Sequence, residues 1–119
     1  MDETQQLIDA ITKGIQEKKG SQIVIADLRE IGDTICQFFI ICQGNSATQT
    51  GAIAEAVAES TRKECHTKPL AVDGMKNATW VAMDYANIIV HIFLPQTREF
   101  YDIEHLWADA RLTALPDID

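Results

Sequence analysis

The sequence predicts an α/β (α+β) fold, in which helices flank a mixed β-sheet of about five strands. Short apolar runs rich in isoleucine, valine and phenylalanine alternate with stretches of helical periodicity. Two of the runs are separated by a short turn-like link, which is typical of an antiparallel hairpin. A long helical stretch separates them from two further runs, and such a crossover indicates a mixed sheet.

The first expected helix covers residues 3–18, where apolar residues recur every three or four positions, and Gly20 is its stop signal. The runs 22–28 and 34–42 are expected to form the hairpin strands, with a turn through Gly32 between them. The chain therefore opens with a helix and an antiparallel pair of strands.

The longest expected helix covers residues 47–64. Ser46 and Gln49 at its start fit the capping box, in which each side chain bonds a backbone N–H group of the other residue. A stripe of small residues along this helix would let it lie close to a sheet. The loop after it contains one short expected strand, at 69–73.

Two strands are expected at 80–85 and 87–94, with Ala86 alone between them. The second run is apolar on both faces, which predicts a central strand covered on both sides. A final helix is expected to be capped by Thr97. Its apolar face would consist of Phe100, Ile103 and Trp107. Residues 114–119 are expected to fray.

The length of 119 residues suits one domain spanning residues 1–119. No apolar run approaches the roughly 20 residues of a membrane span. The N-terminal stretch is acidic and amphipathic, so no export signal is expected. Three cysteines without a Cys-x-x-Cys pair do not describe a disulfide framework. These features predict a cytoplasmic protein with no membrane contact.

The formal net charge is −8, and no run of basic residues exceeds two. Nucleic-acid binding depends on neutralising phosphates, so little direct contact with nucleic acid is expected. Residues 96–119 carry six acidic side chains against Arg98 and Arg111, and such a surface would favour a basic partner. The acidity equally serves solubility, and both interpretations stay open.

The spacing of potential ligands and nucleophiles gives little support to a metal or catalytic site. Cys65 and His66 are adjacent in sequence, which rarely lets two side chains reach one ion. His91 is expected to be a hydrogen-bonded histidine in or beside the core. Ser46 lacks the Gly-x-Ser-x-Gly elbow of a hydrolase and suits a helix cap. We therefore expect no metal ion, no cofactor and no catalytic residue.

One class of enzyme remains as an alternative. A strand, then Gly44-Asn45-Ser46, then a helix resembles the opening of nucleotidyltransferases. That chemistry needs two closely spaced carboxylates on a nearby strand to hold metal ions. Asp84 stands alone on its strand, so the frame occurs without the metal-binding pair. A nucleotide-binding or nucleotidyltransferase-like enzyme is therefore the alternative function.

A dense set of motifs begins at Trp80. It consists of the tryptophan, an Asp-Tyr pair, a Val-His-x-Phe strand, an Arg-Glu-x-Tyr step and a closing Glu-x-Leu-Trp. The matching residues are Trp80, Asp84, Tyr85, Val90, His91, Phe93, Arg98, Glu99, Tyr101, Glu104, Leu106 and Trp107. This pattern resembles the ribosomal silencing factor (Iojap-related) family, and with the earlier segment FFIICQGNSATQTGAIAEAV the likeness covers about residues 3–110. Ala86-Asn87 departs from the Gly-Asp that the family often has there.

The resemblance implies a specific function. Proteins of this family bind the large ribosomal subunit at ribosomal protein L-fourteen, block joining of the small subunit and repress translation. Their fold is similar to a nucleotidyltransferase core without the catalytic carboxylates, so no enzymatic activity is implied. A homodimer off the ribosome is compatible with this function, since an exposed aromatic strand could pair with itself.

Five residues are candidates for the partner-binding surface. Trp80 and Tyr85 are interpreted as apolar anchors, because exposed aromatic side chains bury much area at little entropic cost. Packing of Trp80 beneath a loop is an equally supported alternative. Asp73, Asp84 and Glu104 are the candidate partners for lysine or arginine side chains.

Overall fold

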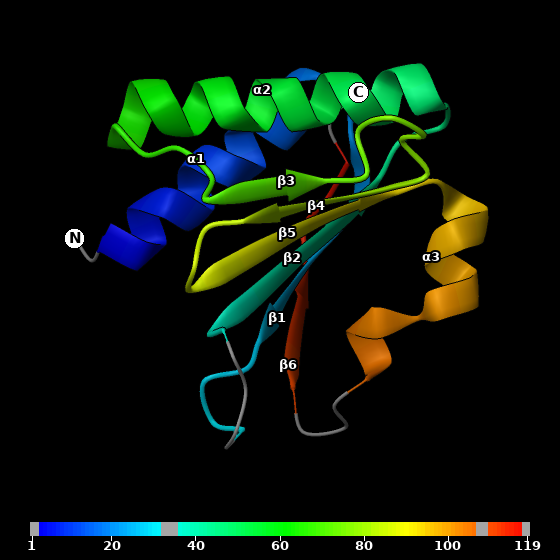
Figure 1. The fold of residues 1–119 in the computed structure, drawn as a ribbon. Helices are drawn as coiled ribbons and strands as arrows, with labels where there is room; N and C mark the ends of the chain where they lie inside the picture. Colours follow the sequence, from blue (N-terminus) through cyan, green and yellow to red (C-terminus); the bar gives the residue numbers. More distant parts are fainter. Residues whose placement is uncertain (1–2, 32–35, 107–109, 118–119) are drawn as a thin grey trace.

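The computed structural model describes residues 3–31, 36–106 and 110–117, which form a six-stranded sheet flanked by helices (Figure 1). In chain order the elements are α1 (Glu3–Glu17), β1 (Ser21–Asp27), β2 (Phe38–Gln43), α2 (Ala47–Cys65), β3 (Ala71–Asp73), β4 (Trp80–Asp84), β5 (Ile88–Phe93), α3 (Pro95–Tyr101), the 3-10 helix η1 (Ile103–His105) and β6 (Arg111–Ala114). The strand order is β3-β4-β5-β2-β1-β6. This mixed sheet confirms the expected fold class, with one strand more than expected.

Strand pairing is antiparallel except between the two central strands. β1 pairs with β2 in the predicted hairpin, and β2 covers Phe38–Gln43. The expected strand start at residue 34 and the expected turn through Gly32 lie outside the described residues. β2 and β5 run parallel, with Phe38 opposite Ile88. The position of β5 between β4 and β2 confirms that it is a central strand. Self-pairing of the aromatic strand β4 is wrong as a route to a dimer, because β3 and β5 occupy both of its edges.

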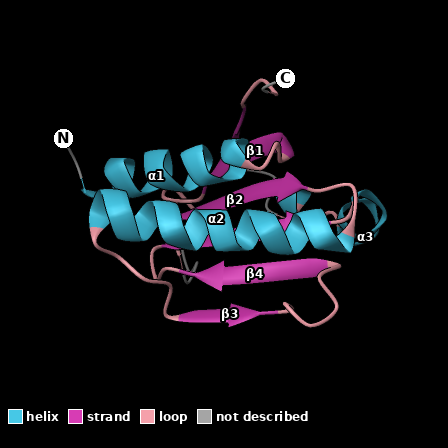
Figure 2. Ribbon diagram, turned by 90° about the horizontal axis from the view of Figure 1, so that it is seen from above, coloured by secondary structure: helices cyan, strands magenta, loops and turns pink. Residues whose placement is uncertain are grey.

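Two packed layers lie on opposite faces of the sheet. α1 and α2 lie side by side on one face (Figure 2). Because strand side chains alternate between faces, Phe38 and Ile40 of β2 pack in the larger core, which also contains buried residues of both helices. Phe39 and Ile41 belong to a second cluster on the opposite face, which Ile103 of η1 partly covers.

The two long helices pack closely because small residues face each other. A Cβ atom added at Gly14 of α1 would lie 2.7 Å from the Cα atom of Val57 in α2. The Ser60 hydroxyl donates to the Ala10 carbonyl oxygen across this interface at 2.6 Å. The stripe of small residues predicted on the second helix therefore meets α1 as well as the sheet.

Half of the expected capping box occurs at the start of α2. The backbone N–H of Gln49 donates to Ser46 Oγ at 3.0 Å. Gln49 does not complete the box at residue 46: its Oε1 accepts from the backbone N–H of Asn45 at 2.7 Å. Its Nε2 donates to the carbonyl oxygens of Lys18 and Lys19, so the same side chain ties the end of α1 to the start of α2.

The last long helix is shorter than expected and starts earlier. α3 begins at Pro95, and its N-cap residue, Leu94, makes no side-chain cap hydrogen bond, so the expected cap at Thr97 is wrong. Proline suits the first helical position because its missing N–H group would have no partner there. The helix ends at Tyr101. Trp107, expected on its apolar face, lies outside the described residues.

The C-terminal segment is ordered further along than expected. β6 pairs antiparallel with β1, with Ala114 opposite Val24. The backbone N–H of Leu115 then donates to the Ile23 carbonyl oxygen at 2.9 Å. Fraying from residue 114 is therefore wrong for Ala114 and Leu115, because paired backbone groups hold both.

Candidate partner-binding surface

Trp80 opens β4 on the face of the sheet that α1 and α2 leave uncovered. Side chains alternate along the strand, so Val81 and Met83 are buried in the larger core while Trp80, Ala82 and Asp84 point the other way. Trp80 is partly buried and packs against the smaller cluster. Trp80 is therefore neither a fully exposed anchor nor a fully packed core residue. One side of its indole packs inside the protein, and the rest is accessible.

An aromatic groove lies where β4 meets α3. The Trp80 ring centroid lies 4.9 Å from that of Phe93 and 4.8 Å from that of Tyr101. Tyr101 is 52% exposed and Phe100 is 81% exposed, so α3 presents aromatic rings to solvent. The groove has a volume of about 360 Å³. It is lined by Thr79, Trp80, Gln96, Thr97, Phe100 and Tyr101.

His91 orients the indole of Trp80. Trp80 Nε1–H donates to His91 Nδ1 at 3.0 Å, so the proton of the neutral imidazole lies on Nε2. His91 is only 7% exposed, and burial lowers its pKa to about 4. Its Nε2 has no hydrogen-bond partner among the described residues. The expected hydrogen-bonded histidine beside the core is confirmed, whereas its contact with Trp80 was not foreseen.

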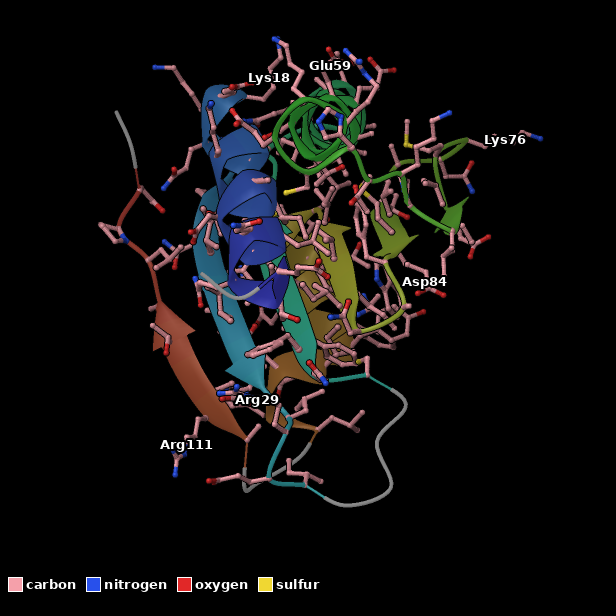
Figure 3. The ribbon with its side chains drawn as sticks, turned by 90° about the vertical axis from the view of Figure 1, so that its left-hand side faces the viewer. Lys18, Arg29, Glu59, Lys76, Asp84 and Arg111 are labelled. Carbon is pink, nitrogen blue, oxygen red and sulfur yellow. The ribbon has the colours of Figure 1, made fainter. Side chains whose placement is uncertain are left out.

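Asp73 and Asp84 share the uncovered face with Trp80. Asp73, in the exposed strand β3, lies opposite Ala82. Asp84 ends β4 four residues after Trp80, or roughly 13 Å along the strand. Its Oδ1 accepts from the backbone N–H of Ala86 at 2.7 Å. In Figure 3, Asp84 lies at the outer side of the sheet, away from α1, where a partner can reach it.

Glu104 is occupied inside the protein. Its two carboxylate oxygens accept from Arg98 Nε at 2.7 Å and Arg98 Nη2 at 3.1 Å, and the two side chains are only 15% and 11% exposed. The interpretation of Glu104 as a contact for a basic partner is therefore corrected, because its charge already balances that of Arg98.

Arg98 was missed as a structural residue of this surface. Its Nη1 donates to the Gln22 carbonyl oxygen at 2.6 Å and to Gln43 Oε1 at 3.2 Å. Gln22 has a positive φ of 53° at an irregularity in the β1–β2 register. With Glu104, these bonds fasten α3 and η1 to the ends of β1 and β2. Arg98 stands in the Arg-Glu-x-Tyr motif, but its partners could not be predicted from sequence spacing, since the glutamines lie 76 and 55 residues from it.

Tyr85 is a core residue and not an anchor. It is 5% exposed and packs in the larger core. Its hydroxyl lies 2.9 Å from Thr61 Oγ1 of α2, within hydrogen-bonding distance. Burial raises the pKa of Tyr85. The interpretation of Tyr85 as an exposed anchor is therefore wrong, because the chain turns its ring beneath the helices immediately after Asp84.

The described residues offer few of the groups that metal or thiol chemistry needs. No group of three His, Cys, Asp or Glu residues among them is placed to hold a metal ion. Burial raises the pKa of Cys42 to about 12 and also raises the pKa of Cys36 and Cys65, which disfavours thiolate nucleophiles. Over the same residues, no helix has the length and hydrophobicity to cross a bilayer. Aromatic rings and carboxylates are what the surface offers to a partner.

Comparison with known proteins places this fold and surface in context. The chain matches, over residues 1–119, the family model described as "Ribosomal silencing factor during starvation". It is 32% identical over 114 residues to "Ribosomal silencing factor RsfS" of Halalkalibacterium halodurans, a match that covers 96% of each chain. It is 28% identical over 72 residues to "Mitochondrial assembly of ribosomal large subunit protein 1" of Mus musculus, covering 59% of this chain and 32% of that protein. A crystal structure of a Chromobacterium violaceum protein matches with a TM-score of 0.83 at 29% identity, covering 91% of this chain and 88% of that one.

Proposed function

The chain belongs to the ribosomal silencing factor family, and on that basis we propose that it binds the large ribosomal subunit through ribosomal protein L-fourteen. Bound there, it keeps the small subunit from joining and so represses translation. The mechanism is steric, since two partners that need the same surface exclude each other. It involves no catalytic step, metal ion or cofactor. The nucleotidyltransferase-like alternative has the frame of strand, Gly44-Asn45-Ser46 and helix, but Asp84 stands alone on its strand where a metal-binding pair would be needed.

The aromatic groove is the observation that supports this proposal most directly. Trp80 and Tyr101 present aromatic rings that can hold an arginine or lysine side chain through cation–π contacts. Asp73 and Asp84 place carboxylates on the same face of the sheet. Ribosomal proteins are basic, so an acidic surface attracts them and speeds association. Phe100, which lines the groove and is 81% exposed, supplies apolar area to bury in the contact.

Sedimentation with purified ribosomal subunits tests the function. We expect the protein to travel with large subunits and not with small ones. Added before the subunits are mixed, it should lower the yield of joined ribosomes, whereas addition after joining should have less effect. Sedimentation with small subunits alone, or no sedimentation with either subunit, would contradict the proposal.

A variant pair tests the aromatic groove. Tyr101→Ala should weaken binding to large subunits by about tenfold or more, as expected when an interface aromatic is removed. The matched control is Leu112→Ala on β6, where a 41% exposed apolar side chain is truncated away from the groove. Both variants should keep the thermal midpoint within a few degrees. Equal binding by Tyr101→Ala and the parent chain would remove the groove from the contact.

A further inference from the structure

The outer edge and the helix side of β3 form a second candidate surface, whereas Asp73 of the same strand points to the face that carries the aromatic groove. Within the described residues β3 pairs with β4 alone, and all three of its residues are exposed. An edge strand presents unpaired backbone N–H and C=O groups to any strand that approaches it. The pairing extends one residue before β3, because the backbone N–H of Leu70 donates to the Asp84 carbonyl oxygen at 2.7 Å.

Apolar side chains line this edge on the side that faces α2. Leu70 is 73% exposed and Val72 is 39% exposed. Val72 lies opposite the buried Met83, so the alternation of side chains puts it on the helix side of the sheet, and Leu70 immediately precedes the strand. Met75, 38% exposed, continues the line toward α2, where its Cε atom is 4.0 Å from the position of a Cβ atom added at Gly51.

Two exposed lysines flank this edge in a protein whose net charge is −8. Arg62 and Lys63, which precede them in the chain, belong to the last turn of α2, where Arg62 pairs with Glu59. Lys68 and Lys76 stand at the two ends of β3, are exposed and form no ion pair with any described residue. Figure 3 shows Lys76 extending from the outer side of the molecule into solvent.

From these three features we propose that β3 binds an extended, acidic segment of a second partner protein, which adds to the sheet as a further strand. Pairing between the two backbones supplies the affinity. The apolar side chains of Leu70, Val72 and Met75 contact alternate side chains of the bound segment. Lys68 and Lys76 favour carboxylates at the two ends of that segment. This surface is chemically opposite to the aromatic groove and faces α2. The protein can therefore hold a basic partner and an acidic one together. The proposal goes beyond the ribosome-binding function and does not rest on it.

Two other occupants fit the edge less well. A second copy that overlaps all of β3 in antiparallel register, centred on Val72, would place Lys68 of each chain opposite Lys76 of the other. Like charges directly opposite each other destabilise a strand pair. A nucleic acid would meet the lysines but has no backbone that can pair with a strand, and it would leave Leu70 without an apolar neighbour.

A matched pair of synthetic peptides tests the proposal on the whole chain. The acidic probe is a labelled nonapeptide with alternating threonine and valine and a glutamate at each end; the basic probe has lysine in place of both glutamates. By fluorescence anisotropy, we expect the acidic probe to bind and the basic probe to bind at least about tenfold more weakly. Double reversal, Lys68→Glu with Lys76→Glu, should invert this preference.

Further measurements separate the proposal from its rivals. Amide exchange at residues 71–73 should slow when the acidic probe binds, because backbone N–H groups gain partners. No binding of the acidic probe up to about 1 mM overturns the proposal. The proposal is also overturned if single-stranded RNA binds through the same lysines more tightly than the acidic probe. It is overturned likewise if the protein forms a dimer that the substitution Leu70→Ser dissociates. Large-subunit sedimentation of the reversal variant should match that of the parent chain, so failure here is distinguishable from failure of the proposed function.

Discussion

Acidification from neutral pH to about pH 5 should destabilise the protein through one buried side chain, His91. Burial lowers the pKa of His91 to about 4 in the folded protein, against about 6.5 in an unfolded chain. Below pH 6.5 the unfolded chain therefore binds a proton that the folded protein does not bind. Stability from this group is fully present above pH 6.5 and falls as the pH drops toward 4, by about 1.4 kcal/mol per pH unit.

The full effect, about 3 kcal/mol, is large against the 5–15 kcal/mol that holds a typical domain together. Protonation also converts Nδ1 into a donor, so His91 can no longer accept the Trp80 Nε1–H bond. Acid should therefore loosen the aromatic groove as it lowers the free energy of unfolding. Urea unfolding followed by far-UV circular dichroism at about pH 7, 6 and 5 measures the slope.

Other side chains with shifted pKa values also change the stability as the pH falls, and their contributions must be separated from that of His91. A hydrogen bond to Asp102 raises the pKa of the exposed His105. Its contribution has the opposite sign, present at low pH and lost as the pH rises through its folded pKa, so His105→Gln removes it. Hydrogen bonds lower the pKa of Asp27 and Glu59, and their contributions are lost as the pH falls through the ordinary values of 3.8 and 4.5, which lie below the range tested. His91→Gln keeps an acceptor for Trp80 and cannot titrate. If His91→Gln lost as much stability as the parent chain between pH 6.5 and 5, the reasoning would be refuted.

Two further substitutions test the backbone and the ion pair. Ala86→Gly should raise the free energy of unfolding by about 0.5–1 kcal/mol in urea titrations, because Ala86 has φ 73° and glycine adopts that conformation without strain; a lower value would show that the turn is unstrained. Arg98→Gln should cost about 3 kcal/mol, since it leaves the Glu104 carboxylate, 15% exposed, without its partner. Adding Glu104→Gln should recover part of that loss, and no recovery would show that the charge is not the cause.

The helices and strands that were predicted most accurately are those whose pattern of apolar residues reflects burial in the core. The central position of β5 followed from a run that is apolar on both faces, and every residue of β5 except Ile89 is buried. The β1–β2 hairpin and the Ser46 cap followed from local signals in the same way. β6 was not found by these means, because all four of its residues are exposed and the alternation of Leu112 and Ala114 with polar residues is too short to stand out from a loop. It exists because the edge of β1 was free to pair.

The candidate surface was predicted only in part, because contacts between distant residues decide which side chains are free. Trp80 and Tyr85 were both predicted to be aromatic anchors. The turn after Asp84 buries Tyr85, whereas Trp80 is partly accessible. Glu104 was removed from the surface by Arg98, a neighbour that sequence spacing does not reveal. Ala86 stands where the resemblance led us to expect glycine, and its backbone has a left-handed φ of 73°, which glycine adopts without strain.

The pairing of β6 with β1 has a consequence for synthesis of the chain. Its partners are far apart in sequence, from 84 residues (27 to 111) to 90 residues (24 to 114). At typical elongation speeds, about 4–18 s pass between translation of β1 and translation of its neighbour. During that interval the outer edge of β1 is an open template for any other nascent strand. The sheet is therefore completed late in synthesis. When the protein is expressed at a high level, so that many nascent chains are present together, more of it should aggregate than its size alone suggests.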